Sequence, residues 1–227
     1  MITIKQADWQ PIPDKIILAE NTVCVFKTDI AEYYSRISDK YQDLLPEKEL
    51  AKAVRYVREA DRKRYIADKY FLRSLLSGII SIPAREIEFN HTADKKPFID
   101  GVEFNVSHSG NYILTAIGSR PIGIDLELVN PDFEFEPLLP NNFSEDEVAY
   151  IAGKAVNFYQ LWTRKEALLK ATGEGITNNL DNVPCLTPTI SRNDSTYNLI
   201  SFTVDEDYTA CLATSINEAE INHLFYE

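Results

Sequence analysis

Apolar residues follow a helical spacing in two long segments of the chain. The first runs from Leu50 to Ile80, where they recur as on one face of an α-helix. Because about 30 residues is long for one globular helix, we expect a break near Glu59–Asp61 and an end at Gly78, a candidate C-terminal cap. The second segment, residues 155–172, carries an apolar stripe, and we expect Gly173 to end this helix.

Shorter segments have the spacing of β-strands, in which successive side chains point to opposite faces. Residues 86–90 and 102–106 alternate by residue, whereas 112–118 is mostly apolar, as in a strand covered on both faces. Residues 107–111 are predicted to form a hairpin loop between the last two of these strands. Further strands are expected at residues 22–27, 122–129, 197–204 and 208–215.

One stretch of the sequence is similar to another. Residues 104–119 and 202–215 each contain a strand, a polar turn and an apolar strand, and each follows a long predicted helix at a distance. Strand–turn–strand patterns also recur by chance. The repetition nevertheless favours two similar α/β halves joined near residues 118–122.

The composition is that of a globular protein. A chain of 227 residues forms one large domain or two small ones, and its 44% hydrophobic and 26% charged residues exclude wholesale disorder. Cys24, Cys185 and Cys211 are too few and too spread for a disulfide framework or a zinc ribbon. There is no signal-peptide pattern and no apolar stretch of roughly 18 residues, so we expect a cytoplasmic protein with reduced thiols and no membrane partner.

Charge is distributed unevenly along the chain. The net charge of −12 argues against nucleic acid as a partner, because nonspecific binding needs a basic surface. Residues 47–73 nevertheless carry a net charge of +4, while residues 121–153 contain eight carboxylates and no Lys or Arg. The first segment is suited to bind an anion and the second a cation.

Asp125 and Glu127 are the first candidates for a metal site. On a strand, residues two apart point to the same face, so these carboxylates lie side by side. The apolar residues around them indicate a substantially buried strand, and a buried carboxylate pair is costly without a cation. Hard oxygen ligands of this kind suit Mg²⁺. The alternative is a strand with one solvated face.

Two further motifs carry candidate chemistry. Trp162, Glu166 and Lys170 share one helix face, with Glu166 near its buried side, although a surface ion pair would give the same spacing. His108 lies in the polar Ser107–Gly110 turn, where small residues let a ligand approach the backbone. An ordinary hairpin turn would also explain that segment.

Basic residues form the last candidate site. Several cations of the first long helical segment share a face, as expected of an anion-binding site or of solvated helix charge, and Lys95 and Lys96 add two more before a strand. The sequence contains neither of the two common phosphate-binding loops, the Walker A motif and GxGxxG. The cations on the shared face are Lys48, Lys52, Arg55, Arg62 and Lys69.

In combination, the motifs are more specific than any one of them alone. The order FNVSHSG (104–110), IGIDLE (122–127) and WTRKEALLK (162–170) resembles the 4′-phosphopantetheinyl transferases, and the longer, monomeric, surfactin-synthetase-activating (Sfp) type is the closer match. The family's Gly-Lys-Pro before the Ser-His turn is Lys95-Lys96-Pro97 here, so the glycine is lost. The detailed match covers roughly residues 48–175.

The resemblance implies a fold and a reaction. The fold would be α+β, with two similar α/β halves, residues 1–119 and 120–227, in a pseudo-two-fold arrangement, each a long helix packed on a small antiparallel sheet, with the active site between them. The reaction would move the phosphopantetheine arm of coenzyme A onto a serine of an acyl or peptidyl carrier protein and release adenosine 3′,5′-bisphosphate. Mg²⁺ would be required, although Mn²⁺ also accepts oxygen ligands.

The resemblance also implies roles for individual residues. The chemistry of the side chains agrees with that reaction: Glu166, or a metal-bound water beside it, would accept the proton of the carrier serine, and Lys170 would neutralise the leaving group or the developing charge. The direct role of Lys165 is less clear from its place on the helix. The metal ligands would be Asp125, Glu127 and Glu166, and the coenzyme would contact Lys48, Lys52, Arg64, Lys96, Ser107, His108 and Lys170.

Two other functions use the same residues. A Mg²⁺-dependent phosphodiesterase or nuclease could employ the three carboxylates on a nucleotide, but the global acidity disfavours it. A non-catalytic module that binds the coenzyme or the carrier is disfavoured because all three carboxylates are present. Carrier proteins are generally acidic, as is this chain, so docking would rely on a local basic or apolar patch.

Overall fold

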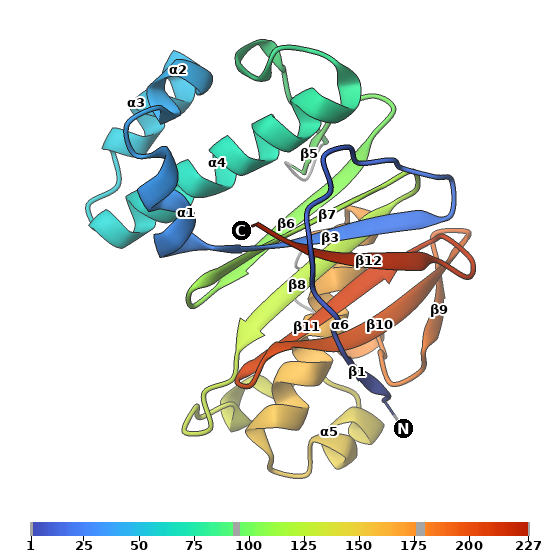
Figure 1. Ribbon diagram of the computed structural model, residues 1–227. Helices are drawn as coiled ribbons and strands as arrows, with labels where there is room; N and C mark the ends of the chain where they lie inside the picture. Colours follow the sequence, from blue (N-terminus) through green and yellow to red (C-terminus); the bar gives the residue numbers. More distant parts are fainter. Residues whose placement is uncertain (1, 93–95, 176–179, 227) are drawn as a thin grey trace.

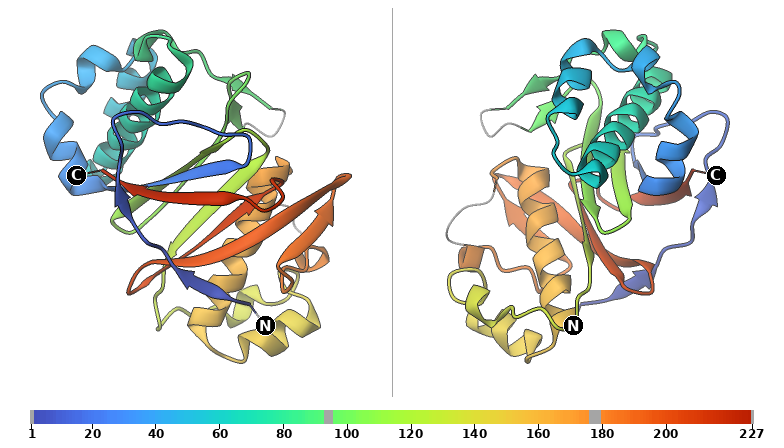
Figure 2. Two further views of the ribbon diagram at one scale, coloured as in Figure 1. Left: turned by 45° about the vertical axis from the view of Figure 1, so that its right-hand side comes forward. Right: turned by 90° about the vertical axis from the view of Figure 1, so that its left-hand side faces the viewer.

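The computed structural model describes residues 2–92, 96–175 and 180–226, which form two β-sheets packed face to face with helices on the outer faces (Figures 1 and 2). The elements up to the long N-terminal helix are β1 (Ile4–Gln6), β2 (Gln10–Pro11), β3 (Thr22–Asp29), α1 (Ile30–Ile37), α2 (Tyr41–Leu44), α3 (Glu47–Val54) and α4 (Glu59–Ile80). The next are η1 (Ala84–Glu86), β4 (Asn90–His91), β5 (Pro97–Phe98), β6 (Glu103–Ser109), β7 (Tyr112–Gly118) and β8 (Ile122–Leu128). The last are η2 (Glu136–Leu138), α5 (Glu145–Ile151), α6 (Ala155–Thr172), η3 (Leu180–Asn182), β9 (Thr189–Arg192), β10 (Ser195–Asp205), β11 (Tyr208–Thr214) and β12 (Glu220–Phe225).

Two five-stranded sheets form the centre of the molecule. One has the order β2-β12-β3-β7-β6, and the other has the order β1-β10-β11-β8 with β9 paired to β10. The β6–β7 hairpin and the β10–β11 hairpin contain the two similar sequence stretches, and each lies in a sheet that a long helix covers. The prediction of an α+β fold with two similar α/β halves is therefore confirmed.

Three apolar cores hold the layers together. Helix α4 packs Phe71 and Leu72 against the sheet that contains β3, and α6 packs Leu168 in a core with Cys211 of β11. The third core lies between the sheets, where apolar side chains of both meet. Its fully buried members include Val23, Val25, Leu114, Ala116, Ile122, Ile124, Ala210 and Leu212.

The terminal strands differ from the sequence prediction of two antiparallel sheets. β1 pairs parallel to β10, and β12 pairs parallel to β3. Residues 4–6 therefore lie in the sheet of the second half, and residues 220–225 lie in the sheet of the first. Each half receives one strand from the far end of the chain. The predicted boundary between residues 119 and 120 therefore separates the two halves only for the elements between these terminal strands.

Several predicted elements have other bounds in the structure. Of the strand predicted at residues 86–90, only Asn90 lies in a strand, β4. Glu86 belongs to η1, and the carbonyl oxygen of Ile87 accepts from the guanidinium of Arg73 instead of a neighbouring strand. The predicted loop 107–111 is shorter, because β6 continues to Ser109. The helical segment breaks at residues 55–58, slightly before the predicted place.

The end of α4 also differs from the prediction. The helix passes through Gly78 to Ile80 and ends at Ser81, which adopts the left-handed conformation (φ 58°). By contrast, α6 ends at Gly173 as predicted. Among the described residues, no helix is both long enough and apolar enough to cross a lipid bilayer. The three cysteines are free and buried.

Candidate active site

Strand β8 and helix α6 are in direct contact at Gly123. A side chain at this position would overlap main-chain atoms of Ala167 and Ala171, so only glycine allows so close an approach. The contact explains why the apolar β8 segment contains a glycine. It places Glu166 and Lys170, which lie on either side of this crossing, next to the strand.

The three predicted metal ligands form a cluster of carboxylates. Asp125 is 4% exposed and Glu166 is 7% exposed, while Glu127 is half-buried. Burial and the charge of Asp125 raise the pKa of Glu166 to about 7, and the same two causes raise the pKa of Glu127. Burial also raises the pKa of Asp125, against the opposing effect of Lys170. The cluster therefore attracts a cation.

The ammonium group of Lys170 is the cation nearest to this cluster. It lies 2.6 Å from Oδ1 of Asp125 and donates to the hydroxyl of Ser107 and the carbonyl oxygen of Ile124, each at 3.2 Å. The Ser107 hydroxyl in turn donates to Asp125 at 2.9 Å and accepts from the amide of Leu126 at 3.3 Å. A hydroxyl has one donor and two acceptor sites, so these partners fill the capacity of Ser107.

Ser107 belongs to a row of side chains that joins the two halves. Asn105 accepts from the amide of Ile124 at 2.8 Å, and Ser109 accepts from the amide of Leu128 at 3.0 Å and donates to Glu127 at 2.9 Å. We call Asn105, Ser107 and Ser109 the polar seam. Through the polar seam, side chains of β6 accept hydrogen bonds from backbone amides of β8, in place of the backbone-to-backbone bonds of a sheet. Because β6 belongs to the first half and β8 to the second, the carboxylate cluster lies on the boundary between the halves.

The carboxylates do not form a preassembled metal cage. In the described part of the chain, no group of three or more His, Cys, Asp or Glu side chains has the arrangement of a metal site. The donor set nevertheless fits Mg²⁺. Oδ2 of Asp125 is buried without a hydrogen-bond partner among the described residues, and the neighbouring donors are carboxylate oxygens, which Mg²⁺ prefers.

His108 and Arg64 lie close together at one end of the polar seam. His108 is a strand residue with an exposed side chain, and partial desolvation followed by the nearby guanidinium of Arg64 lowers its pKa below the usual value. Arg64 also lines a cavity of about 340 Å³ with Ala60 of α4 and with Gly110 and Asn111 of the β6–β7 turn. This cavity is large enough to hold part of a phosphate-bearing ligand.

Lys48 and Lys52 line a different cavity, of about 190 Å³, between α3, α4 and β4. The ammonium group of Lys52 lies 5.2 Å from the ring centroid of Tyr65, and that of Lys69 lies 5.9 Å from it. The structure therefore brings Lys48 and Lys52 together but places Arg64 at the other cavity. Lys69, which the sequence places on the same cationic helix face, also lines this cavity, as does His91, for which no role was predicted.

Lys96 connects the first half to the start of β8. Its ammonium group donates to the carbonyl oxygen of Ile122 at 3.2 Å, and burial lowers its pKa. Lys95 lies outside the described residues. Lys96 is therefore near the β8 strand, at the end opposite to Glu127.

Arg164 and Lys165 have structural contacts instead of facing the cluster. Both are buried: Arg164 donates to the carbonyl oxygen of Cys185 at 2.6 Å, and Lys165 pairs with the fully buried Glu147 at 2.8 Å. Lys165 also donates to the carbonyl oxygen of Val183 at 2.6 Å. These two side chains attach the chain after α6 to the helix, which leaves Glu166 and Lys170 free to face β8.

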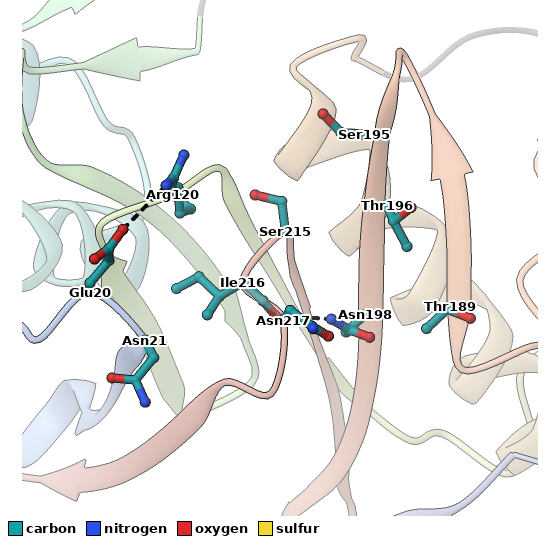
Figure 3. A pocket seen from close by; sticks show the side chains of 10 residues that line it. All are labelled: Glu20, Asn21, Arg120, Thr189, Ser195, Thr196, Asn198, Ser215, Ile216 and Asn217. Carbon is teal, nitrogen blue, oxygen red and sulfur yellow. Dashed lines mark hydrogen bonds and ion pairs between the residues drawn. The ribbon is translucent and has the colours of Figure 1, made fainter.

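A cavity of about 680 Å³, larger than the two that the basic residues line, lies away from these residues (Figure 3). Its lining is mostly uncharged and polar, and its two charged side chains, Glu20 and Arg120, form an ion pair with each other (Figure 3). No residue predicted to act in binding or catalysis lines it. Size alone therefore does not identify the active site.

Comparison with known proteins identifies the class of the chain. The sequence model of a family described as 4′-phosphopantetheinyl transferase, N-terminal, matches residues 35–120, and that of the 4′-phosphopantetheinyl transferase superfamily matches residues 121–215. The two matches meet where the sequence predicts the halves to join.

Individual relatives agree. The 4′-phosphopantetheinyl transferase HetI of Nostoc sp. is 31% identical over 225 residues, which are 92% of this chain and 94% of that protein. The 4′-phosphopantetheinyl transferase gsp of Aneurinibacillus migulanus is 34% identical over 54% of each chain, and Sfp of Bacillus subtilis is 28% identical over 64% of this chain and 67% of that protein. The chain therefore belongs to the 4′-phosphopantetheinyl transferase family. Membership in a transferase family favours group transfer over a phosphodiesterase or a binding module.

Proposed function

We propose that this protein transfers the 4′-phosphopantetheine arm of coenzyme A to a serine of an acyl or peptidyl carrier protein, with the help of Mg²⁺ or Mn²⁺. The observation that carries the proposal is the cluster between β8 and α6. There, Lys170 lies 2.6 Å from Asp125, and Glu166 has a pKa raised to about 7. Family membership supports the class of reaction.

The cluster has the groups that such a transfer needs. Asp125, Glu127 and Glu166 would hold the ion, and when it is bound it supplies positive charge for the pyrophosphate oxygens. The buried and unpartnered oxygen of Asp125 is the part of the site that most clearly needs such a ligand. Lys170 would supply a second positive charge beside the leaving phosphate.

The reaction replaces the phosphoanhydride bond of the coenzyme by a phosphate ester on the carrier. The serine oxygen of the carrier forms a bond to the phosphorus that bears the pantetheine arm, and the bond from that phosphorus to the bridging oxygen of the pyrophosphate breaks. Adenosine 3′,5′-bisphosphate leaves with that oxygen. Glu166, or a water beside it, would accept the serine proton.

The remaining basic residues would bind the coenzyme. Arg64 and His108 are at the end of the polar seam, and Lys48 and Lys52 line the cavity next to α4, so phosphates could contact either group. Lys96 would act from the other end of β8. The Ser107 hydroxyl already uses all its hydrogen-bonding capacity on protein partners. We therefore assign Ser107 an indirect role, which is to position Asp125 and Lys170.

A transfer assay tests the proposal. The protein is incubated with coenzyme A, Mg²⁺ and either an apo-acyl carrier protein or an apo-peptidyl carrier domain, and the carrier is analysed by mass spectrometry. We expect a mass gain of one phosphopantetheine arm, with release of adenosine 3′,5′-bisphosphate. A carrier whose acceptor serine is replaced by alanine is the control. Unchanged mass of both carriers would refute the proposal.

A monomeric state, a cytoplasmic location and the absence of nucleic-acid and membrane partners stay predictions from the sequence. Size-exclusion chromatography with light scattering tests the first of them.

A further inference from the structure

We propose that the turn between α3 and α4 is the surface on which the carrier protein docks through an acidic face. The residues of this surface are Val54, Arg55, Val57 and Arg58, and we call it the elbow. The inference rests on the proposed function, because it names the place where the acceptor substrate of that reaction binds.

Exposed apolar side chains are the first observation. Val57 is 100% exposed and Val54 is 78% exposed, the highest values among the large apolar side chains of the described residues. The turn itself is held firmly: the amide of Tyr56 donates to the carbonyl oxygen of Ala53, and its ring lies 5.3 Å from that of Tyr65. The valines are therefore presented outward by an anchored turn, as expected for a contact surface.

Unpaired positive charge is the second observation. Residues 52–58 contain three cations and no carboxylate. The guanidinium groups of Arg55 and Arg58 form no ion pair with any residue that the structure describes, whereas Lys63 and Arg64 on α4 pair with nearby carboxylates. Two exposed apolar side chains and two guanidinium groups within five residues of one turn fit an acidic protein surface that also presents an apolar side chain.

The rest of the molecule restricts where an acidic partner can approach. Outside residues 47–73 the chain has a net charge of −16, and residues 128–146, which follow β8, contain five carboxylates and no Lys or Arg. An acidic carrier would be repelled from that side of the active site. The same field would direct it toward the elbow.

The elbow also lies near the end of the active site that contains Glu127. It immediately precedes α4 (Figure 1), in whose first two turns Ala60 and Arg64 share a cavity with Gly110 of the β6–β7 turn. That turn follows Ser109, which binds Glu127 of the carboxylate cluster. A carrier on the elbow would therefore reach the cluster across this cavity.

The test separates carrier binding from coenzyme binding. The double variant Arg55→Glu/Arg58→Glu and the single variant Val57→Asp are compared with the controls Arg85→Glu and Ile17→Asp, which alter exposed residues elsewhere. The acceptor is an apo-acyl carrier protein. KM for this carrier and for coenzyme A are measured, and binding of the fluorescently labelled carrier is followed by anisotropy without coenzyme or metal.

We expect KM for the carrier to rise about tenfold in the charge variant, with less than about a twofold change in KM for coenzyme A. Carrier binding to the unaltered protein should weaken with added salt, and this dependence should be smaller in the charge variant. Unchanged carrier affinity in both elbow variants, or an equal loss in the controls, would overturn the elbow assignment alone. If the unaltered protein modifies no carrier, the proposed function fails, and the elbow assignment fails with it.

Discussion

The ionisation of Glu166 governs both the chemistry and the stability of the site. Burial and the charge of Asp125 raise its pKa from the ordinary 4.5 to about 7, so the folded protein favours the protonated form. Without a divalent ion, the protein should lose stability as the pH rises from about 4.5 to about 7, because ionisation costs more in the folded than in the unfolded state. The proposed reaction nevertheless needs the ionised form, to hold a divalent ion and to accept the serine proton.

Glu166→Gln should therefore abolish transfer and stabilise the metal-free protein. The expected gain in unfolding free energy is up to about 3 kcal/mol above pH 7, because one pKa unit is worth 1.36 kcal/mol, and it should shrink toward zero below about pH 4.5. Urea denaturation with a chelator present, at about pH 5 and about pH 8, measures this difference. Equal stability of the two proteins at the higher pH would contradict the assigned environment of Glu166.

Gly123→Ala should disable the site without altering any polar group. The added methyl group would overlap main-chain atoms of Ala167 and Ala171, so α6 must move away from β8 and carry Lys170 with it. We expect a loss of about 3 kcal/mol in stability and a loss of transfer activity. Gly118→Ala is the control, since its nearest neighbours lie 3.5 Å away. Thermal denaturation and the mass-spectrometric assay would show whether the two variants differ.

At the scale of elements, the second half of α6 makes contacts on two sides: Lys165 pairs with Glu147 of α5, and Lys170 binds Asp125 of β8. Lys165→Met should leave the fully buried carboxylate of Glu147 without its cation and destabilise the protein by about 3 kcal/mol. KM for coenzyme A should stay unchanged in the folded fraction, because Lys165 does not face β8. The double variant Lys165→Met/Glu147→Gln should recover part of the stability. A Lys165→Met protein of normal stability but without activity would instead assign Lys165 to the chemistry.

The pattern of apolar residues predicted the long helices and central strands because burial of one face or both faces fixes their periodicity. It failed for residues 86–89, where alternation is present but the carbonyl oxygen of Ile87 binds the side chain of Arg73 in place of a neighbouring strand. It also failed for Gly78, because propensity alone does not say where packing ends a helix. Long-range contacts of this kind leave no local signal.

The candidate site was predictable to a similar extent. Spacing placed Asp125 and Glu127 on one strand face and Glu166 and Lys170 on one helix face, and the family resemblance brought the two faces together in one site. The seam role of Asn105 could not be predicted, because its partner is a backbone amide 19 residues away. The place of His91 beside Lys48 and Lys52 could not be predicted either, because it depends on how β4 packs near α3 and α4. Side-chain hydrogen bonds between edge strands follow no sequence period.

At the scale of the whole molecule, the two halves depend on each other for burial. The core between the sheets contains residues of both, and the polar seam joins their adjacent edges. The exchanged strands add a further connection, since β12 completes the first sheet and β1 extends the second. Separation of the halves would expose all of these surfaces to water. We infer that neither half is stable alone, although the similar halves suggest two units.

The whole molecule should therefore unfold in one cooperative transition, and the two tryptophans allow this to be measured. Trp9 donates to the carbonyl oxygen of Val204 at 3.2 Å and reports on the contact between the N-terminal segment and β10, whereas Trp162 lies on α6 and stacks on Phe158. In the single-tryptophan variants Trp162→Phe and Trp9→Phe, the fluorescence midpoint in urea should coincide with that of far-ultraviolet circular dichroism for the same variant. If the fluorescence and dichroism midpoints differ within a variant, the halves are separate folding units, and the exchanged strands do not couple them.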